Sequence, residues 1–219
     1  MYDKLKVGRF LRDYIVADLD DLDAVADTTL RKVADPLKFP LSYEDKEDIL
    51  DLHWRFDSGR DGIVGLAAPQ VGLSKRIIMI GIREDMAEQM ETQMFEKTVW
   101  VNPRFYSPDE EIEEGWEQCR SVKNYVGLVP RYKNVVYSGF HEDGRPIRGR
   151  ASGFAARIIQ HEIDHLDGKL FIDRIPREKL MTEDEYMKEF HSPDERMEKE
   201  IDGPSVPAFP KFESKFALC

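Results

Sequence analysis

The chain has few cysteines, an excess of acidic over basic residues, and no long apolar run. Its two cysteines, Cys119 and Cys219, are too few for a disulfide framework, so a reducing compartment is expected. The formal net charge of -11 argues against a general affinity for nucleic acid or anionic membranes, because both reward clustered lysine and arginine. No apolar run approaches the roughly 20 residues of a membrane span. The composition therefore predicts no specific nucleic-acid partner and no membrane span.

The N-terminal segment also lacks the features of a targeting sequence. Residues 1–25 are acidic, and they contain neither an apolar signal core nor the Arg-rich, acid-poor character of a transit peptide. We expect that any targeting segment was removed or never existed, and the latter case would place the protein in the cytoplasm. The apolar content of 41% can fill one substantial core, which indicates a single globular domain.

A metal-binding pattern is the strongest feature that the chain does contain. His161, Glu162 and His165 form HExxH within QHEIDHLDG. On a helix, this spacing directs both imidazoles to one point with the glutamate beside them. Ser152 is a suitable N-cap and Gly168 a suitable C-terminal cap, so a helix is predicted between them. The structural alternative is a pair of core histidines on an amphipathic helix.

A catalytic metal site needs a third protein ligand and an open position for water. A metzincin would have a histidine where this chain has Phe171. A gluzincin, and hence an HExxH metalloprotease, would use a downstream glutamate such as Glu183 or Glu185. A thiolate is the remaining choice, and Cys119 lies in GWEQCRSV, a stretch without helical or strand alternation. Cys119 is the candidate third ligand, and the two glutamates remain alternatives.

Three short motifs, in this order, resemble those of the peptide deformylases. GLAAPQ, EQCRS and QHEIDH are similar to the family patterns GxGLAAxQ, EGCLS and QHExDH. The resemblance covers about residues 30–175. Residues 1–175 are therefore predicted to form the catalytic domain, and residues 176–219 a charged helix followed by an irregular, proline-containing tail. LVPRY and the run before QHEIDH are closer to organelle-type eukaryotic members, which implies a mitochondrial or other organelle matrix.

The resemblance implies a role for each matched residue. Three side chains would hold one divalent metal ion, Fe²⁺ by preference with Zn²⁺, Ni²⁺ or Co²⁺ as substitutes: Cys119, His161 and His165. Glu162 would be the general acid and base, while Gln70 and the backbone N–H of Arg120 would bond the formyl oxygen. The implied function is removal of the N-formyl group from the formylmethionine of newly made polypeptides, with transient ribosome association.

The family also implies a peptide groove beside the metal. The methionine side chain would lie against Val64, Phe154, Ile158 and the ring of His161. The backbone of Val64 and Gly65 would pair with the substrate as an added strand, so many sequences could be accepted.

The chain departs from the family pattern at three positions. Ile63 replaces the first glycine of GxGLAAxQ, and Gln118 and Arg120 replace the Gly and Leu of EGCLS. We expect Gln118 either to crowd the groove or to shift the loop that carries Cys119. We expect Arg120 to place a positive charge at the mouth of the groove, where it would attract acidic substrates or narrow the entry for ordinary peptides. The alternative function is thus a deformylase-like protein with weak or shifted specificity.

The remaining patterns predict an α+β fold, with antiparallel strands around a central HExxH helix. Residues 43–56 are predicted to be helical after an N-cap at Ser42. Strands are predicted over 76–82 and 98–106, and two more within 134–151. A short helix is predicted from the spacing of three methionines: Met86, Met90 and Met94.

Overall fold

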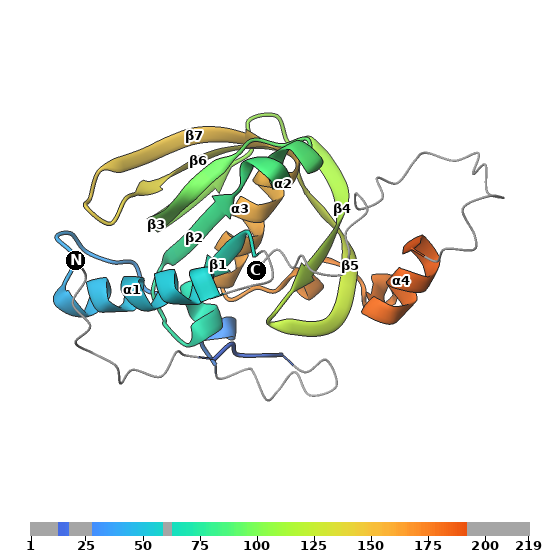
Figure 1. Cartoon of the computed structure of the whole chain (residues 1–219), viewed down its shortest axis with the longest axis horizontal. Coiled ribbons are helices and arrows are strands. Elements are labelled where there is room, and N and C mark those ends of the chain that lie inside the picture. The colour runs from blue at the N-terminus through green and yellow to red at the C-terminus, as the bar shows by residue number, and fades with distance from the viewer. Residues whose placement is uncertain (1–12, 18–27, 59–62, 192–219) are drawn as a thin grey trace.

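The computed structural model describes residues 13–17, 28–58 and 63–191 (Figure 1). Its helices are α1 (Tyr43–Ser58), α2 (Glu84–Gln89), α3 (Gly153–Leu166) and α4 (Glu183–His191). Its strands are β1 (Gly65–Ala67), β2 (Ile77–Ile82), β3 (Phe95–Tyr106), β4 (Ile112–Cys119), β5 (Val122–Tyr132), β6 (Asn134–Phe140), β7 (Pro146–Ser152) and β8 (Leu180–Thr182). The predicted α+β class is confirmed.

The strands form two antiparallel sheets, and α3 contacts both of them (Figure 1). One sheet has the order β1-β2-β3-β6-β7 and the other β4-β5-β8. The main apolar core lies between the five-stranded sheet and α3, and it includes Ile78, Ile80, Trp100, Tyr137, Ile158 and Ile159. The helix that carries HExxH is therefore held on one side by a large apolar face.

Helix α1 covers the opposite face of the same sheet, but only over β1, β2 and β3. Its Ile49 and Leu52 pack against side chains from these strands, among them Leu66, Ile77, Met79 and Val99. The predicted N-cap is confirmed, because Ser42 Oγ accepts a hydrogen bond from the Asp45 N–H at 3.1 Å and Asp45 Oδ2 accepts one from the Ser42 N–H at 3.0 Å.

The four predicted strand regions correspond to β2, β3, β6 and β7. GWEQCRSV, for which no element was predicted, contains the end of β4 and the first residue of β5, two strands that pair with each other. Trp116, Glu117 and Cys119 are all buried near the end of β4. A strand buried on both faces shows no alternation of polar and apolar residues, so this strand was missed.

The predicted methionine helix is shorter than its spacing suggests. Helix α2 ends at Gln89, and Glu91 has a positive φ of 46°, which turns the chain before Met94. The same turn places Thr92 at the start of α3, where its Oγ1 accepts a hydrogen bond from the Ala155 N–H at 3.1 Å. Ser152 occupies the predicted N-cap position, but its side chain makes no capping hydrogen bond.

The segment after residue 175 packs on the three-stranded sheet. Strand β8 pairs with β5, and the Tyr186 ring of α4 meets the Trp116 ring at 4.9 Å between centroids. Helix α4 agrees with the predicted charged helix, whereas the tail at 192–219, with Cys219, lies outside the described residues. In the described part of the chain, no helix is long and apolar enough to cross a bilayer.

Candidate metal centre

Cys119, His161 and His165 lie together in one buried group. Strand β4 ends at Cys119, and α3 presents both histidines to it. The three ligand atoms lie within 4.8 Å of one another, and Cys119 Sγ is 3.5 Å from His165 Nε2. Within residues 13–17, 28–58 and 63–191, this is the one such group of three ligand residues, and neither Glu183 nor Glu185 belongs to it.

Glu117 fixes the ring of His161. The Glu117 carboxylate lies 2.8 Å from His161 Nδ1, so Nε2 is the nitrogen left to face Cys119. Burial by itself would lower the pKa of His161, but hydrogen bonds with Cys119 and Glu117 raise it to about 10. A carboxylate behind a ligand histidine holds the ring orientation and increases its basicity as a ligand.

Two buried arginines neutralise Glu117. Its Oε1 accepts hydrogen bonds from Arg131 Nε at 2.8 Å and Arg157 Nη1 at 2.9 Å, and its Oε2 accepts one from Arg131 Nη2 at 2.8 Å. Burial alone would raise the pKa of Glu117, but the charge and hydrogen bonds of Arg131 hold it well below the ordinary value. Sequence reasoning missed Glu117, although it lies two residues before Cys119 in a matched motif.

Two further residues of QHEIDH hold α3 in place. Gln160 bonds both backbone groups of Tyr132: its Oε1 accepts from the N–H at 3.0 Å and its Nε2 donates to the carbonyl at 2.7 Å. Asp164 is paired with Arg131 and Arg174. These contacts explain why polar residues occupy buried positions on this helix, and sequence reasoning gave them no role.

Glu162 lies on the same helix with its carboxyl group fully buried. Neither carboxylate oxygen has a hydrogen-bond partner among the described residues. Burial raises the pKa of Glu162 well above its ordinary value; the positive charge of His161 opposes this shift and the negative charge of Cys119 adds to it. A Cβ at Gly65 would lie 2.1 Å from Glu162 Oε1, so only glycine leaves room for the carboxyl group.

Gln70 lies beside the thiol, in a short 3-10 helix over Ala68–Val71. Its Oε1 accepts a hydrogen bond from the Ala67 N–H at 2.8 Å, which directs Nε2 toward Cys119 Sγ at 3.7 Å and Ser121 Oγ at 3.3 Å. The amide is therefore held with its donor end at the predicted metal position.

An N-terminal segment, residues 13–17, forms backbone hydrogen bonds with both the GLAAPQ motif and the EQCRS motif. The Ile15 N–H donates to the Gln70 carbonyl at 2.8 Å, and the Ala17 N–H donates to the Ser121 carbonyl at 2.7 Å. Sequence reasoning gave this segment no role. Its hydrogen bonds constrain the separation between Gln70 and the loop that carries Arg120.

The substitutions in EQCRS are accommodated differently from the expectation. The Gln118 side chain does not crowd the groove but donates a hydrogen bond to Glu183 at the start of α4. The Arg120 guanidinium lies 5.8 Å from the centroid of the Tyr14 ring, and Arg55 lies 4.2 Å from the same centroid. Two cations thus lie near one aromatic ring, and one of them, Arg120, directly follows Cys119 in the chain.

The residues predicted to line the methionine pocket share one apolar cluster. Val64 and Ile158 are buried and Phe154 is half-buried in it. Strand β1 begins at Gly65 and is the edge strand of the five-stranded sheet, where it pairs with β2 on one side only. Ile63 is buried in the separate cluster under α1. An edge strand can accept a further strand by backbone pairing.

Residues 20–181 match the family model for polypeptide deformylase, which is more than half of the chain. The chain belongs to the peptide deformylase family. Peptide deformylase 2 of Rickettsia conorii is 40% identical over 183 residues, which span 81% of this chain and 90% of that protein. Peptide deformylase 2 of Pseudomonas putida is 36% identical over 157 residues, 71% of this chain and 86% of that protein.

Solved structures of peptide deformylases share the fold. A class I type b enzyme from Acinetobacter baumannii, bound to Met-Ala-Ser, is 30% identical with a TM-score of 0.61, covering 74% of this chain and 98% of that one. The Synechococcus elongatus enzyme in complex with actinonin is 31% identical with a TM-score of 0.61, covering 81% and 85%. The protein is thus a metal-dependent hydrolase that removes the formyl group from peptide N-termini.

Proposed function

We propose that Cys119, His161 and His165 hold the divalent ion of this deformylase, with Fe²⁺ preferred over Zn²⁺, Ni²⁺ or Co²⁺. The single observation that carries the proposal is the buried group of one thiol and two imidazoles, because these are donors of a three-ligand catalytic site. The buried carboxyl group of Glu162, which has no hydrogen-bond partner within the described ranges, supports the fit. When bound, the ion supplies Lewis acidity that lowers the pKa of a water molecule and polarises the formyl carbonyl.

The chain itself supplies the proton transfers and the oxyanion donors. Glu162 takes a proton from the attacking water and passes it to the leaving amine, a role that suits a carboxyl group whose pKa is raised by burial. Gln70 Nε2 and the Arg120 N–H donate hydrogen bonds to the formyl oxygen as negative charge develops on it.

The substrate is an N-formylmethionyl peptide that pairs with the edge of β1. The backbone of Val64 and Gly65 binds the peptide, and the methionine side chain fills the slot formed by Val64, Phe154, Ile158 and the His161 ring. Backbone pairing accepts many sequences, whereas the apolar slot discriminates by side-chain shape.

Metal content and turnover of Cys119→Ala test this function. Under anaerobic conditions we expect the variant to lose its metal and its hydrolysis of formyl-Met-Ala-Ser, while the matched thiol variant Cys219→Ser keeps both. Full metal occupancy in Cys119→Ala would show that the thiol is not a ligand. Cleavage of internal peptide bonds instead of formyl release would favour the metalloprotease alternative.

We further propose that the substrate preference is shifted toward acidic residues after the methionine. The support is that two cations, Arg55 and Arg120, lie near the Tyr14 ring, and that Arg120 directly follows Cys119. Arg120→Leu should lower the ratio of kcat/KM for formyl-Met-Asp-Ser to that for formyl-Met-Ala-Ser and leave metal content unchanged. Arg145→Leu, on the β6–β7 hairpin, is the matched control. An unchanged ratio in Arg120→Leu would remove the proposal.

We also propose an organelle matrix as the location and a transient association with the ribosome. The support is the resemblance of LVPRY and the α3 sequence to organelle-type members, and the requirement that the enzyme meet newly made chains. Fractionation of the source cells, followed by co-sedimentation with ribosomes of the compartment found, tests both; recovery in the cytosol would overturn the first.

A further inference from the structure

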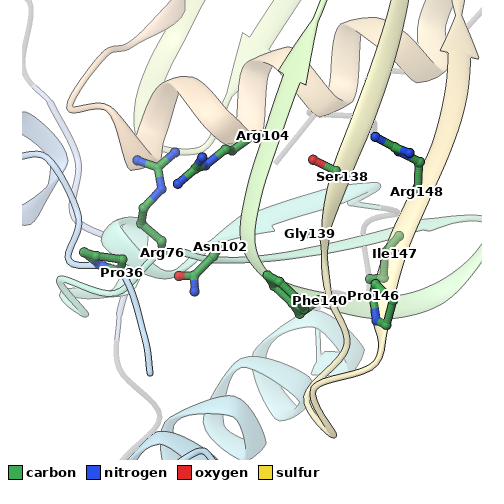
Figure 2. A pocket seen from close by; sticks show the side chains of 10 residues that line it. All are labelled: Pro36, Arg76, Asn102, Arg104, Ser138, Gly139, Phe140, Pro146, Ile147 and Arg148. Atoms are coloured by element: carbon green, nitrogen blue, oxygen red, sulfur yellow. The ribbon is translucent and has the colours of Figure 1, made fainter. Parts of the chain in front are cut away.

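A groove lined by arginines lies on the five-stranded sheet, and none of its lining residues belongs to the metal centre (Figure 2). It has a volume of about 800 Å³. Three arginines, Arg76, Arg104 and Arg148, line it together with Asn102, Ser138 and Phe140. In Figure 2, Arg76 and Arg104 lie at one end and Arg148 lies on the far strand.

The groove occupies the sheet face opposite α3. Neighbouring side chains of β3, β6 and β7, such as Phe105, Tyr137 and Ile147, point into the core under α3. Because successive side chains of a strand point to opposite faces, Arg104, Ser138 and Arg148 point the other way. Helix α1 covers that face only over β1 to β3, so the arginine-lined part is open.

Two of the three arginines in this groove are not compensated by carboxylates. Arg76 is bound to Asp167 at 2.7 Å, but the exposed side chains of Arg104 and Arg148 make no hydrogen bond or ion pair within the described part of the chain. Arg148 lies on edge strand β7, where a cation discourages pairing with another sheet. Arg104 lies two strands inside the edge, so edge protection does not account for it.

The two arginines without a carboxylate partner lie in one row across three strands. Arg104, Ser138 and Arg148 are directly opposite one another on three neighbouring strands, which separates the two arginines by about 10 Å at the backbone. The Phe140 ring lines the groove but packs against the Phe39 ring at 5.4 Å between centroids. Tyr106, on the same face as Arg104 and next to the lining residues, is 61% exposed. Cations that contact phosphates beside exposed aromatic rings form the usual surface for single-stranded nucleic acid.

We infer that this groove binds a single-stranded segment of RNA. Arg104 and Arg148 contact phosphates, while the exposed ring of Tyr106 stacks on a base. An acidic peptide would use the arginines but leave the exposed Tyr106 ring without a function. The net charge of -11 repels a polyanion from the rest of the surface and confines it to this groove.

Fluorescence anisotropy with labelled oligouridylate and oligoadenylate of about 12 nucleotides tests the inference. Two phosphate contacts predict a slope of log affinity against log salt of about -1.4, which is about a sevenfold loss between about 50 and 200 mM salt. Arg104→Ala with Arg148→Ala should weaken binding at least tenfold at low salt and flatten the slope. Arg104→Lys with Arg148→Lys should retain the slope.

Arg83→Ala with Lys97→Ala removes two exposed cations elsewhere and is the matched control; it should bind RNA like the wild type. All variants should keep full deformylase activity, which verifies folding independently of RNA binding. The inference is overturned if the wild type does not bind RNA, or if the double alanine variant binds equally well. It is also overturned if polyglutamate displaces RNA as effectively as unlabelled RNA does, because the groove would then recognise acidic protein segments.

Discussion

Glu162 and Gly65 define the chemistry of the site at the scale of single residues. The Glu162 carboxyl group is buried at a position that a methyl group on Gly65 would fill. Its raised pKa makes the carboxylate a better proton acceptor than an exposed glutamate, and it can return the proton to an amine within the same site. The Glu162 carboxyl group is therefore both held in a fixed place and more basic than an exposed glutamate.

Glu162→Gln tests this proton transfer without changing the size of the side chain. The amide cannot accept a proton, so kcat should fall about 10²- to 10⁴-fold while metal content stays at the wild-type level. Metal analysis and steady-state kinetics measure the two effects separately. Glu178→Gln, at an exposed position, is the control and should be fully active. A kcat within a few-fold of wild type in Glu162→Gln would exclude this residue as the base.

At the scale of elements, α3 is capped by a residue that is distant in sequence. Thr92 Oγ1 accepts the Ala155 N–H, whereas Ser152 at the N-cap position makes no side-chain cap. Gly168 ends the helix as predicted, with a φ of 71°. The position of the HExxH helix thus depends on the turn after α2.

Thr92→Val and Ser152→Ala separate these two candidate caps. Thr92→Val keeps the shape of the side chain but removes the acceptor, so it should lower the free energy of unfolding by about 1 kcal/mol. Ser152→Ala should change it by less than about 0.5 kcal/mol. Urea unfolding of both variants measures the difference. A larger loss for Ser152→Ala than for Thr92→Val would contradict the assignment.

At the scale of the whole molecule, a buried set of charges joins α3 to the smaller sheet. Arg131 on β5 binds Glu117 on β4 and Asp164 on α3, and Glu117 in turn holds the His161 ring. Arg157 adds bonds to the carbonyls of Gly115, Val129 and Glu113. The metal ligands therefore keep their positions because the three-stranded sheet and α3 share one charge network.

Arg131→Met should be strongly destabilising, because it leaves two carboxylates buried without their shared cation. A loss of about 3 to 5 kcal/mol is expected in the free energy of unfolding. Arg145→Met removes an arginine that is 74% exposed and paired with Asp143, and should cost less than about 0.5 kcal/mol. Chemical denaturation at neutral pH compares the two. Equal stability of both variants would show that the network does not hold the three-stranded sheet and α3 together.

The sequence alone determined the local features of this protein. Spacing on one helix placed His161, Glu162 and His165 together, and turn and capping residues marked α1, α3 and four strands. These features depend on periodicity and backbone preference, which neighbouring residues settle among themselves. The three motifs also identified Cys119 and Gln70 as candidates. Their residue types and order are visible without a structure.

Only the tertiary structure decided which distant residues meet. It buried Glu117 beside His161, closed α3 with Thr92, turned Gln118 toward Glu183, and placed Arg104 and Arg148 on an uncovered sheet face. It also revealed strand β4, where buried Glu117 and its neighbour Trp116 break the alternation of polar and apolar residues that marks a strand. Pairing between segments far apart depends on how sheets and helices pack. That packing leaves no periodic signal in the residues that make the contacts.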